Sequence, residues 1–331
     1  NSCLDNVSNV MTFCGYFIYY EFFKGRNELV LTEKVLINFF RKYNYIFSLN
    51  KIENTNFNIN TKKIRKFFLK NYKKKYINRK DFLINIYIAY HLTLKRKFTK
   101  KTVLVHHSHN IEHTEEFLKD FPNSKIFITI RDPRANLRSG IYNWFKYSPK
   151  YKHMDHIFFY IKRVREDLNY ILKKKNRKLF IKIEESNLKK TKKKIFKFLN
   201  LRFDNNIYKS TLASKLWNAD KVSRGNLPSQ KFTKSGKINK SINLDLWEKY
   251  FTSSDLKFLS LIYHKYNIFG YDLKKTPLSE RLFLLCKCVL PMSFEKITFS
   301  QKGFSFKKKL KNYIFFFKRV FYFASIILLI R

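Results

Sequence analysis

The chain has 331 residues, 45% of them hydrophobic, which is typical of a globular protein that can bury one large core or two smaller ones. Its net charge of +45 comes from lysines scattered through almost every segment, so the charge predicts solvated helix faces and no specific nucleic-acid site. The 4 cysteines follow neither a disulfide framework nor a common zinc spacing, and reduced cysteines are typical of a cytoplasmic protein.

Residues 1–23 are predicted to hold the end of a helix, around Ser2 to Asn6, followed by an apolar aromatic run to Phe23. The chain begins without Met and without a signal peptide, so we interpret it as a fragment whose true start is missing. Residues 24–100 show mostly helical periodicity with Lys-rich outer faces. Buried stripes are expected at Val35, Leu36, Phe39 and Phe40, and at Phe82, Ile86, Ala89 and Tyr90.

Histidines follow the next predicted strand, Thr102 to Val105, in the order His106-His107-Ser108-His109. Asn110 is typical of an N-cap and predicts a helix from Ile111 to about Lys119. Adjacent ligands on one loop rarely converge on one ion, so we predict no metal site here. A histidine near its ordinary pKa is suited to accept a proton from a hydroxyl group, and hydrogen-bonded loop histidines are the alternative.

The stretch from Lys125 to Tyr147 carries the clearest pattern in the chain. Lys125 to Ile130 is apolar and β-branched, as in a buried strand, and Asp132-Pro133 predicts an N-cap and the first residue of a helix. The buried stripe of that helix is expected at Leu137, Ile141, Trp144 and Phe145. Together with the preceding strand and helix, this predicts a βαβ unit of parallel strands. The histidines and Arg131 would then share the crevice beyond the carboxyl ends of the strands.

Two residues suggest an anion at this crevice. Arg134 lies in the first helical turn, where the helix dipole disfavours a cation unless a bound phosphate offsets it. Ser139 lies off the apolar stripe of the same helix. The alternative is that Arg131 and Arg134 pair with carboxylates and that Ser139 faces solvent.

A long helix is predicted over residues 151–175, with Ile157, Phe158, Ile161, Val164, Leu168 and Ile171 on its buried face. A strand from Leu179 to Ile183 leads to Glu184-Glu185, and a Lys-rich helix then ends at Phe198-Leu199-Asn200-Leu201, with Asn200 suited to a C-cap. The acidic pair could orient basic residues near a ligand or could form an ordinary strand-end turn.

Residues 205–243 are predicted to form a long loop, and a loop of this length in a compact domain usually has a function. Residues 274–331 are predicted to be a basic, aromatic tail. Its uninterrupted apolar part, Val320 to Ile330, is shorter than the roughly 20 residues that span a bilayer. A basic amphipathic segment on an anionic membrane surface is one interpretation, and packing against the domain or a second subunit is the other.

Arg131-Asp132-Pro133-Arg134 with Ser139 resembles the 3′-phosphate-binding motif of sulfotransferases that use 3′-phosphoadenosine 5′-phosphosulfate (PAPS), in particular the bacterial type. The likeness spans residues 1–273 and is strongest at 101–147 and 178–204. It implies an α/β fold with a parallel sheet flanked by helices, as in the P-loop-NTPase-like sulfotransferase core. Residues 1–273 would be this domain, and residues 274–331 would be the tail.

The resemblance also implies a reaction and its residues. A sulfuryl group would pass from PAPS to a hydroxyl or amine of a saccharide, lipid or small-molecule acceptor. Arg131 and Ser139 would hold the 3′-phosphate, helped by Lys240 from the basic loop. A helix at Leu246 to Phe251 would follow that loop, as in the family. His107 would act as general base, with His106 as the next candidate. The protein would be cytoplasmic, with membrane contact through the tail.

The chain departs from the family at the 5′-phosphosulfate loop, because it contains no Gly-rich phosphate loop. If the resemblance holds, that loop is expected upstream of Asn1, and the chain as it stands is expected to be inactive. The alternative is a nucleotide- or polyanion-binding protein on the same fold, without catalysis.

Overall fold

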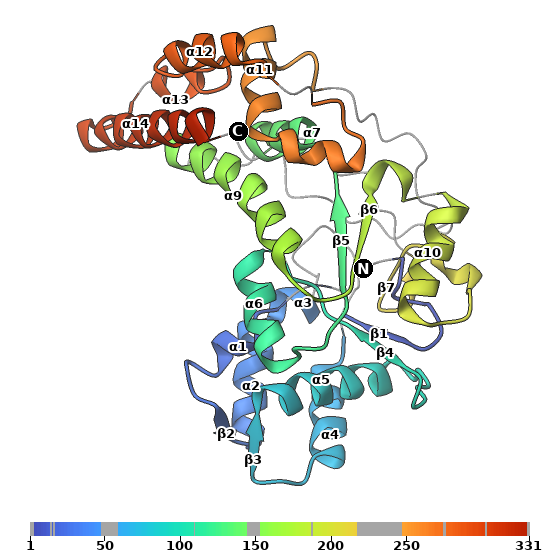
Figure 1. Cartoon of the computed structure of the whole chain (residues 1–331). Helices are drawn as coiled ribbons and strands as arrows, with labels where there is room; N and C mark the ends of the chain where they lie inside the picture. Colours follow the sequence, from blue (N-terminus) through green and yellow to red (C-terminus); the bar gives the residue numbers. More distant parts are fainter. Residues whose placement is uncertain are drawn as a thin grey trace. The chain divides into compact units, whose positions relative to one another are not determined.

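The computed structural model describes residues 3–13, 15, 17–47, 59–108, 110–143, 153–186, 188–216, 247–273, 276–301 and 303–329 (Figure 1). The chain divides into two compact units, each described below by itself. Unit 1 comprises Asn1–Ile128, Asn176–Ile181 and Glu185–Lys240, and unit 2 comprises Thr129–Lys175, Lys182–Glu184 and Ser241–Arg331. This division differs from the predicted one, because residues 274–331 belong to unit 2 together with residues 129–175 instead of forming a separate tail.

The elements up to the middle of the chain are β1 (Val10–Thr12), α1 (Tyr19–Phe22), β2 (Glu28–Val30), α2 (Glu33–Lys42), α3 (Asn44–Phe47), α4 (Thr61–Asn71), β3 (Tyr76–Asn78), α5 (Arg79–Thr93), β4 (Val103–Val105), α6 (Ile111–Asp120) and β5 (Ile126–Ile130). The later elements are α7 (Pro133–Arg138), the π-helical turn η1 (Ser139–Asn143), α9 (Met154–Lys173), β6 (Lys178–Lys182), η3 (Ile183–Glu185), α10 (Lys189–Leu199), η4 (Asn205–Tyr208), β7 (Thr211–Leu212), β8 (Lys215–Leu216), α11 (Ser253–Ile262), η5 (His264–Phe269), α12 (Leu278–Lys287), α13 (Lys296–Phe299) and α14 (Phe306–Leu329).

The strands of the described residues form two-stranded pairs. β1 runs parallel to β4, with Val10 opposite Val103 and Thr12 opposite Val105, and β2 runs antiparallel to β3. β5 pairs with β6, and β7 with β8. The protein is therefore a mixed α/β structure with short strand pairs. The prediction that strands 102–105 and 125–130 are neighbours in one βαβ unit is wrong, because β4 and β5 pair with other strands.

The N-terminal prediction needs a second correction. Residues 3–6 form a turn, where the end of a helix was expected. The first regular element of the described residues is the strand β1, which lies within the apolar run that follows. Val10, Met11 and Thr12 are all buried. Three apolar or β-branched residues suit a helix or a strand equally well, and the partner strand β4, far along the chain, decides between them.

Aromatic rings fill the core of unit 1. Of the predicted stripes, Phe82, Ile86, Ala89 and Tyr90 on α5 are buried, as are Leu36, Phe39 and Phe40 on α2, while Val35 is only partly buried. Phe39 packs edge-on against Phe82, with 5.0 Å between their ring centroids, and so links the two stripes. The prediction of two amphipathic helices with these inner faces is confirmed.

The strand, turn and helix predicted around Arg131 are present. β5 ends at Ile130, and the Asp132 side chain caps α7 by accepting the N–H of Arg134 at 2.8 Å, with Pro133 as the first helical residue. Leu137 and Ile141 are buried as predicted, whereas Trp144 and Phe145 lie outside the described residues.

Three later predictions have clear outcomes. All six residues of the expected inner face of α9 are buried, and α10 ends at Asn200 in the left-handed conformation (φ 59°, ψ 40°) of a C-cap. The helix expected at 246–251 is wrong, because Trp247 to Tyr250 form a turn and α11 begins at Ser253. Thr252 explains that start, since it makes a capping box with Asp255.

The last helix, α14, packs along α9 within unit 2 (Figure 1). Arg319 of α14 and Glu295, just before α13, are both completely buried, and a terminal nitrogen of Arg319 lies 2.6 Å from Glu295 Oε2. Arg319 also donates to the carbonyl groups of Cys288 and Leu290. Burial raises the pKa of Glu295, while the charge of Arg319 lowers it. The pair is therefore an internal electrostatic anchor for α14.

Arg319→Met should destabilise the protein by about 3–5 kcal/mol, because Glu295 would remain buried without its partner. The double variant Arg319→Met with Glu295→Leu should recover most of that loss, since no buried charge is left. Lys318→Met, one residue away on the exposed side, is the matched control and should change the free energy of unfolding by less than about 0.5 kcal/mol. Urea unfolding of the whole chain measures all three, and equal losses in the single and double variants would contradict this account.

Candidate functional site

Arg131 stands where β5 ends, directly before the N-cap of α7, as the sequence predicts. Its side chain is partly buried, and its Nε has no hydrogen-bond partner among the described residues. Burial raises the pKa of the nearby Tyr160 phenol, and the charges of Arg163 and Arg131 oppose that rise. Buried N–H donors normally have an acceptor, so Arg131 keeps hydrogen-bonding capacity for one that the described chain does not supply.

Arg134, in contrast, is held by the protein itself. Its Nε and a terminal nitrogen donate to the two carboxylate oxygens of Asp132 at 3.0 and 2.6 Å. Its other terminal nitrogen donates to the carbonyl of Asp272 at 3.1 Å, and the guanidinium lies 4.1 Å from the centre of the Trp247 ring. The cation in the first turn of α7 is therefore offset by a carboxylate, which was the alternative explanation of Arg134.

Glu184 fixes the turn between β5 and α7. Its two carboxylate oxygens accept the backbone N–H of Asp132 at 3.2 Å and the hydroxyl of Tyr271 at 2.9 Å. Burial raises the pKa of the Tyr271 hydroxyl, and the charge of Glu184 raises it further. Lys182 lies 5.0 Å from the centre of the same ring. Glu184 thus helps to shape the turn that carries Arg131.

Ser139 is the C-cap of α7 and the first residue of the π-helical turn η1. Gly140 follows it, and a Cβ atom there would lie 2.1 Å from the ring of Tyr160, so only glycine lets this turn pack on α9. Tyr160 is fixed in turn, because its hydroxyl donates to Asn136 Oδ1 at 3.0 Å. His156 of α9 hydrogen-bonds to the backbone of Gly140, and burial lowers its pKa. π-Helical turns often occur at functional sites, and this one begins at Ser139.

The aromatic residues of the 247–250 turn stack on the arginines of α7. The guanidinium of Arg138 lies 4.3 Å from the centre of the Tyr250 ring, and that of Arg134 lies 4.1 Å from the centre of the Trp247 ring. The Nε of Arg138 is buried without a partner among the described residues. A guanidinium can hold a phosphate through two parallel hydrogen bonds. The end of β5 and the helix after it can therefore bind an anion, with Arg131 and Arg138 as the residues that retain unpartnered donors.

His106 and His107 lie in unit 1, in the loop after β4. The Nδ1 of His106 shares a hydrogen bond with the Tyr87 hydroxyl at 3.0 Å, and its ring stacks on Phe117 with centroids 5.1 Å apart. Burial lowers the pKa of His106 to about 3, helped by His107 and His113. A group with so low a pKa is a poor proton acceptor near neutral pH, so His106, which these rings partly bury, is not a convincing general base.

The carboxyl ends of β1 and β4 are covered by aromatic rings. Phe13, directly after β1, stacks on Tyr90 at 4.2 Å and packs edge-on against Phe17 at 5.0 Å. The Tyr87 hydroxyl lies 3.4 Å from the carbonyl of Val105, the last residue of β4. Phe13, Phe17, Tyr87 and Tyr90 are all buried, so these rings form part of the core of unit 1 beside this strand pair.

The predicted site residues therefore fall into separate groups. Arg131 and Ser139 belong to one strand–turn–helix element of unit 2, and His106 and His107 belong to one loop of unit 1. Lys240 lies outside the described residues.

No family model, curated protein or solved structure matches this chain.

The aromatic and acidic partners of the arginines were not predicted. Arg138 was not among the predicted site residues, and Trp247 and Tyr250 were expected on a helix. A weak signal existed, because aromatic rings in a cationic chain are frequent partners of guanidinium groups. Which ring meets which arginine could not be foreseen, since the partners are more than a hundred residues apart in the chain.

The burial of His106 predicts acid sensitivity. The folded pKa of about 3 lies below the ordinary 6.5, so the unfolded chain binds a proton that the folded chain does not. The contribution of neutral His106 to the free energy of unfolding is fully present above pH 6.5 and decreases as the pH falls towards 3. At pH 5 this contribution has fallen by about 2 kcal/mol. In His106→Phe, the loss of stability between pH 7 and pH 5 should be smaller by about that amount. Urea unfolding at both pH values tests this.

Phe68→Leu is the control for this experiment. It reduces a buried ring of unit 1 that packs on Phe82 and not on His106, so it should lower stability at both pH values while keeping the pH dependence. A parent-like loss of stability on acidification in His106→Phe would show that other groups govern the response.

Proposed function

We propose that the protein binds the 3′-phosphate of PAPS at the end of β5 and serves sulfuryl transfer to a hydroxyl or amine acceptor. The observation that carries the proposal is Arg131, a strand-end arginine with a buried and unpartnered Nε, followed by a capped helix and Ser139 at its π-helical end. These features support the resemblance to the 3′-phosphate motif of sulfotransferases.

The residues of the motif have different roles in this proposal. Arg131 donates parallel hydrogen bonds to the phosphate oxygens, and Ser139 donates one more from the turn η1. Arg134 does not bind the ligand, because its guanidinium is occupied by Asp132, the carbonyl of Asp272 and the Trp247 ring. Its role is to hold the turn in which Arg131 stands. Lys240 remains a candidate for a further phosphate contact.

Sulfuryl transfer resembles phosphoryl transfer in being governed by positioning and by charge neutralisation. The acceptor oxygen or nitrogen forms a bond to sulfur while the bond from sulfur to the phosphate oxygen breaks. The acceptor proton passes to a general base, for which His107 is the candidate of this chain. His106 is less suited, because burial depresses its pKa.

A second function, nucleotide or polyanion binding without catalysis, has an observation in its favour. Arg131 with its unpartnered donor belongs to unit 2, whereas the proposed base belongs to unit 1. Anion binding by Arg131 and Ser139 therefore does not require the proposed base. Sulfate transfer to a panel of saccharide, lipid and phenolic acceptors separates the two functions.

The test of the anion site is calorimetric binding of 3′-phosphoadenosine 5′-phosphate to the whole chain. Arg131→Ala should weaken binding by roughly 2–4 kcal/mol, since one partner of a desolvated charge pair is lost. Ser139→Ala should weaken it by about 1–3 kcal/mol, the range for one hydrogen bond to a charged group. Arg163→Ala, which removes a half-exposed arginine from α9 in the same unit, is the matched control and should bind like the parent.

The contradicting outcomes are specific. Adenosine 5′-phosphate should bind much more weakly than the 3′-phosphorylated ligand, and equal affinities would exclude a 3′-phosphate site. Parent-like binding by Arg131→Ala would remove the basis of the family assignment. His107→Ala should keep ligand affinity and lower turnover by about 10²–10⁴-fold, and unchanged turnover would place the base elsewhere.

A further inference from the structure

Helix α14 has the length and composition of a membrane helix. It is 24 residues long, about 36 Å at the usual rise per residue, and is the one helix of the described residues that is long and apolar enough to cross a bilayer by those criteria alone. Length and composition do not distinguish a helix that spans from one that lies on a surface. The contacts of its two faces do.

The inner face of α14 is tied to the rest of unit 2 by polar groups. Asn312 accepts the N–H of Met154 at 3.1 Å and donates to the carbonyl of Thr298 at 2.7 Å. Seven residues later, Arg319 makes the buried ion pair with Glu295. A spanning α14 would have to break these bonds and carry Asn312 and Arg319 into lipid. The helix is therefore an integral part of unit 2, which excludes a free transmembrane span.

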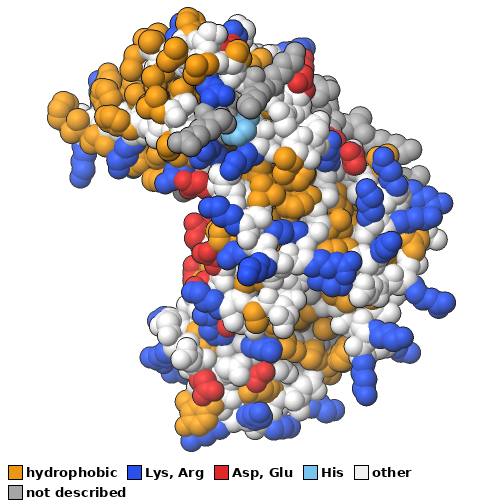
Figure 2. All heavy atoms as spheres, in the orientation of Figure 1, with side chains coloured by type: hydrophobic (Ala, Val, Ile, Leu, Met, Phe, Trp, Pro, Cys, Tyr) orange, Lys and Arg blue, Asp and Glu red, His pale blue; other side chains and the backbone are white. Residues whose placement is uncertain are grey.

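The outer face of α14 is a continuous apolar stripe. Residues at helical spacings of three, four or seven recur along it, and all are exposed: Phe306, Leu310, Tyr313, Phe317, Phe321 and Leu328. Phe321 is 74% exposed and Leu328 is 68% exposed. Hydrophobic side chains also gather over α12 and α14 in the space-filling view (Figure 2).

Helix α12 and the segment after it, which pack beside α14, enlarge this surface. The exposed residues there are Leu278, Leu282, Phe283, Val289 and Leu290. We call the exposed apolar residues of α12, of the segment directly after it and of α14 the apolar platform. Single exposed apolar residues are common, but a set of this size on adjoining helices marks an interaction site.

The charge of α14 indicates what covers the platform. The helix contains Lys307, Lys308, Lys309, Lys311 and Lys318, all exposed, and no acidic residue. On a helical projection, Lys307 and Lys318 flank one side of the apolar stripe, whereas Lys311 on the same side forms an ion pair with Asp155 of α9 at 2.6 Å. An apolar face bordered by lysines complements an anionic lipid surface, where rings enter the interface and ammonium groups meet phosphates.

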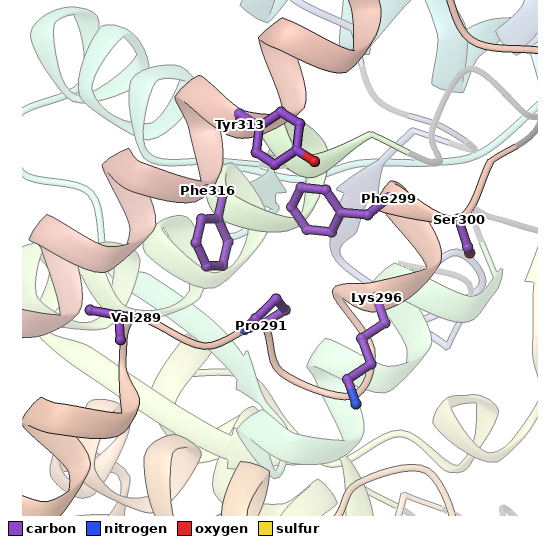
Figure 3. A pocket seen from close by; sticks show the side chains of 7 residues that line it. All are labelled: Val289, Pro291, Lys296, Phe299, Ser300, Tyr313 and Phe316. Carbon is purple, nitrogen blue, oxygen red and sulfur yellow. The ribbon is translucent and has the colours of Figure 1, made fainter.

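A pocket in the same part of unit 2 has matching chemistry (Figure 3). It holds about 430 Å³ and is lined by Val289, Pro291, Lys296, Phe299, Ser300, Tyr313 and Phe316. Val289 and Tyr313 belong also to the platform, so the two surfaces are continuous. An apolar hollow with an ammonium group in its wall suits an acyl chain and its anionic headgroup.

We propose that the apolar platform of α12 and α14 docks on an anionic lipid membrane, with α14 lying in the plane of the surface and one phospholipid chain entering the pocket. The platform rings occupy the boundary between headgroups and acyl chains, and the lysines contact the phosphates. This inference does not depend on sulfuryl transfer, since it uses none of the residues proposed to bind PAPS.

The test is flotation of the whole chain with vesicles of phosphatidylcholine alone or mixed with phosphatidylglycerol. Binding to the mixed vesicles should be at least about 100-fold tighter and should weaken in high salt. The triple variant Lys307→Gln, Lys308→Gln and Lys309→Gln should bind them about 100-fold more weakly. The control is a second triple variant, Lys73→Gln, Lys74→Gln and Lys75→Gln, which removes the same charge from three consecutive exposed lysines of unit 1. Its affinity for the mixed vesicles should fall much less.

The apolar part is tested by Phe317→Glu and Phe321→Glu, each of which should weaken vesicle binding by about tenfold or more. Both rings are exposed, so the fold should persist, and the thermal unfolding of each variant checks this. Tyr76→Glu, at a half-exposed ring of β3 in unit 1, is the matched control and should bind vesicles like the parent.

Four results would overturn the proposal. The first is equal binding to both kinds of vesicle, and the second is parent-like binding by the two glutamate variants. The third is resistance of the bound protein to extraction with alkaline carbonate, which indicates a spanning helix. The fourth is a protein that does not bind vesicles but forms a dimer, which Phe317→Glu dissociates. That result would assign the platform to contact with a second copy of the chain.

Discussion

The ion pair between Arg319 and Glu295 determines how the last helix is placed. An apolar stripe can slide by a turn along its neighbour at modest cost, but a buried guanidinium needs its carboxylate and carbonyl partners in one position. Arg319 finds all of them between residues 288 and 295, so the register of α14 within unit 2 is fixed. Because the buried and the exposed apolar residues belong to the same helix, this register also determines which way the exposed stripe of α14 faces.

Local sequence signals predicted the elements whose geometry a few adjacent residues decide. Asp132-Pro133 marked the start of α7, Asn200 the end of α10, and the inner face of α9 followed from its spacing alone. The failures involve partners far apart in the chain. β1 is a strand because β4 lies beside it, and the 247–250 turn is held by the arginines of α7, so neither could be inferred from its own residues.

The candidate site shows the same division between local and distant causes. The position of Arg131 at a strand end was predicted from the sequence. The choice between phosphate and carboxylate for Arg134 was left open, although its partner Asp132 is only two residues away. The enclosure of His106 by aromatic rings could not be predicted. Three histidines in one loop look equivalent in the sequence, and rings from Phe17, Tyr87 and Phe117 enclose His106. Those rings come from three separate parts of the chain.

Unit 2 also has a consequence for biosynthesis. Its inner helix α9 ends at Lys173, whereas the helix that covers it, α14, begins at Phe306. At ribosomal rates of roughly 5–20 residues per second, the covering helix emerges on the order of ten seconds later. During that interval Phe158 and its apolar neighbours on α9 lack part of their final cover, and Glu295 is made before its arginine. The nascent chain therefore offers a hydrophobic helix face to chaperones until α14 has been synthesised.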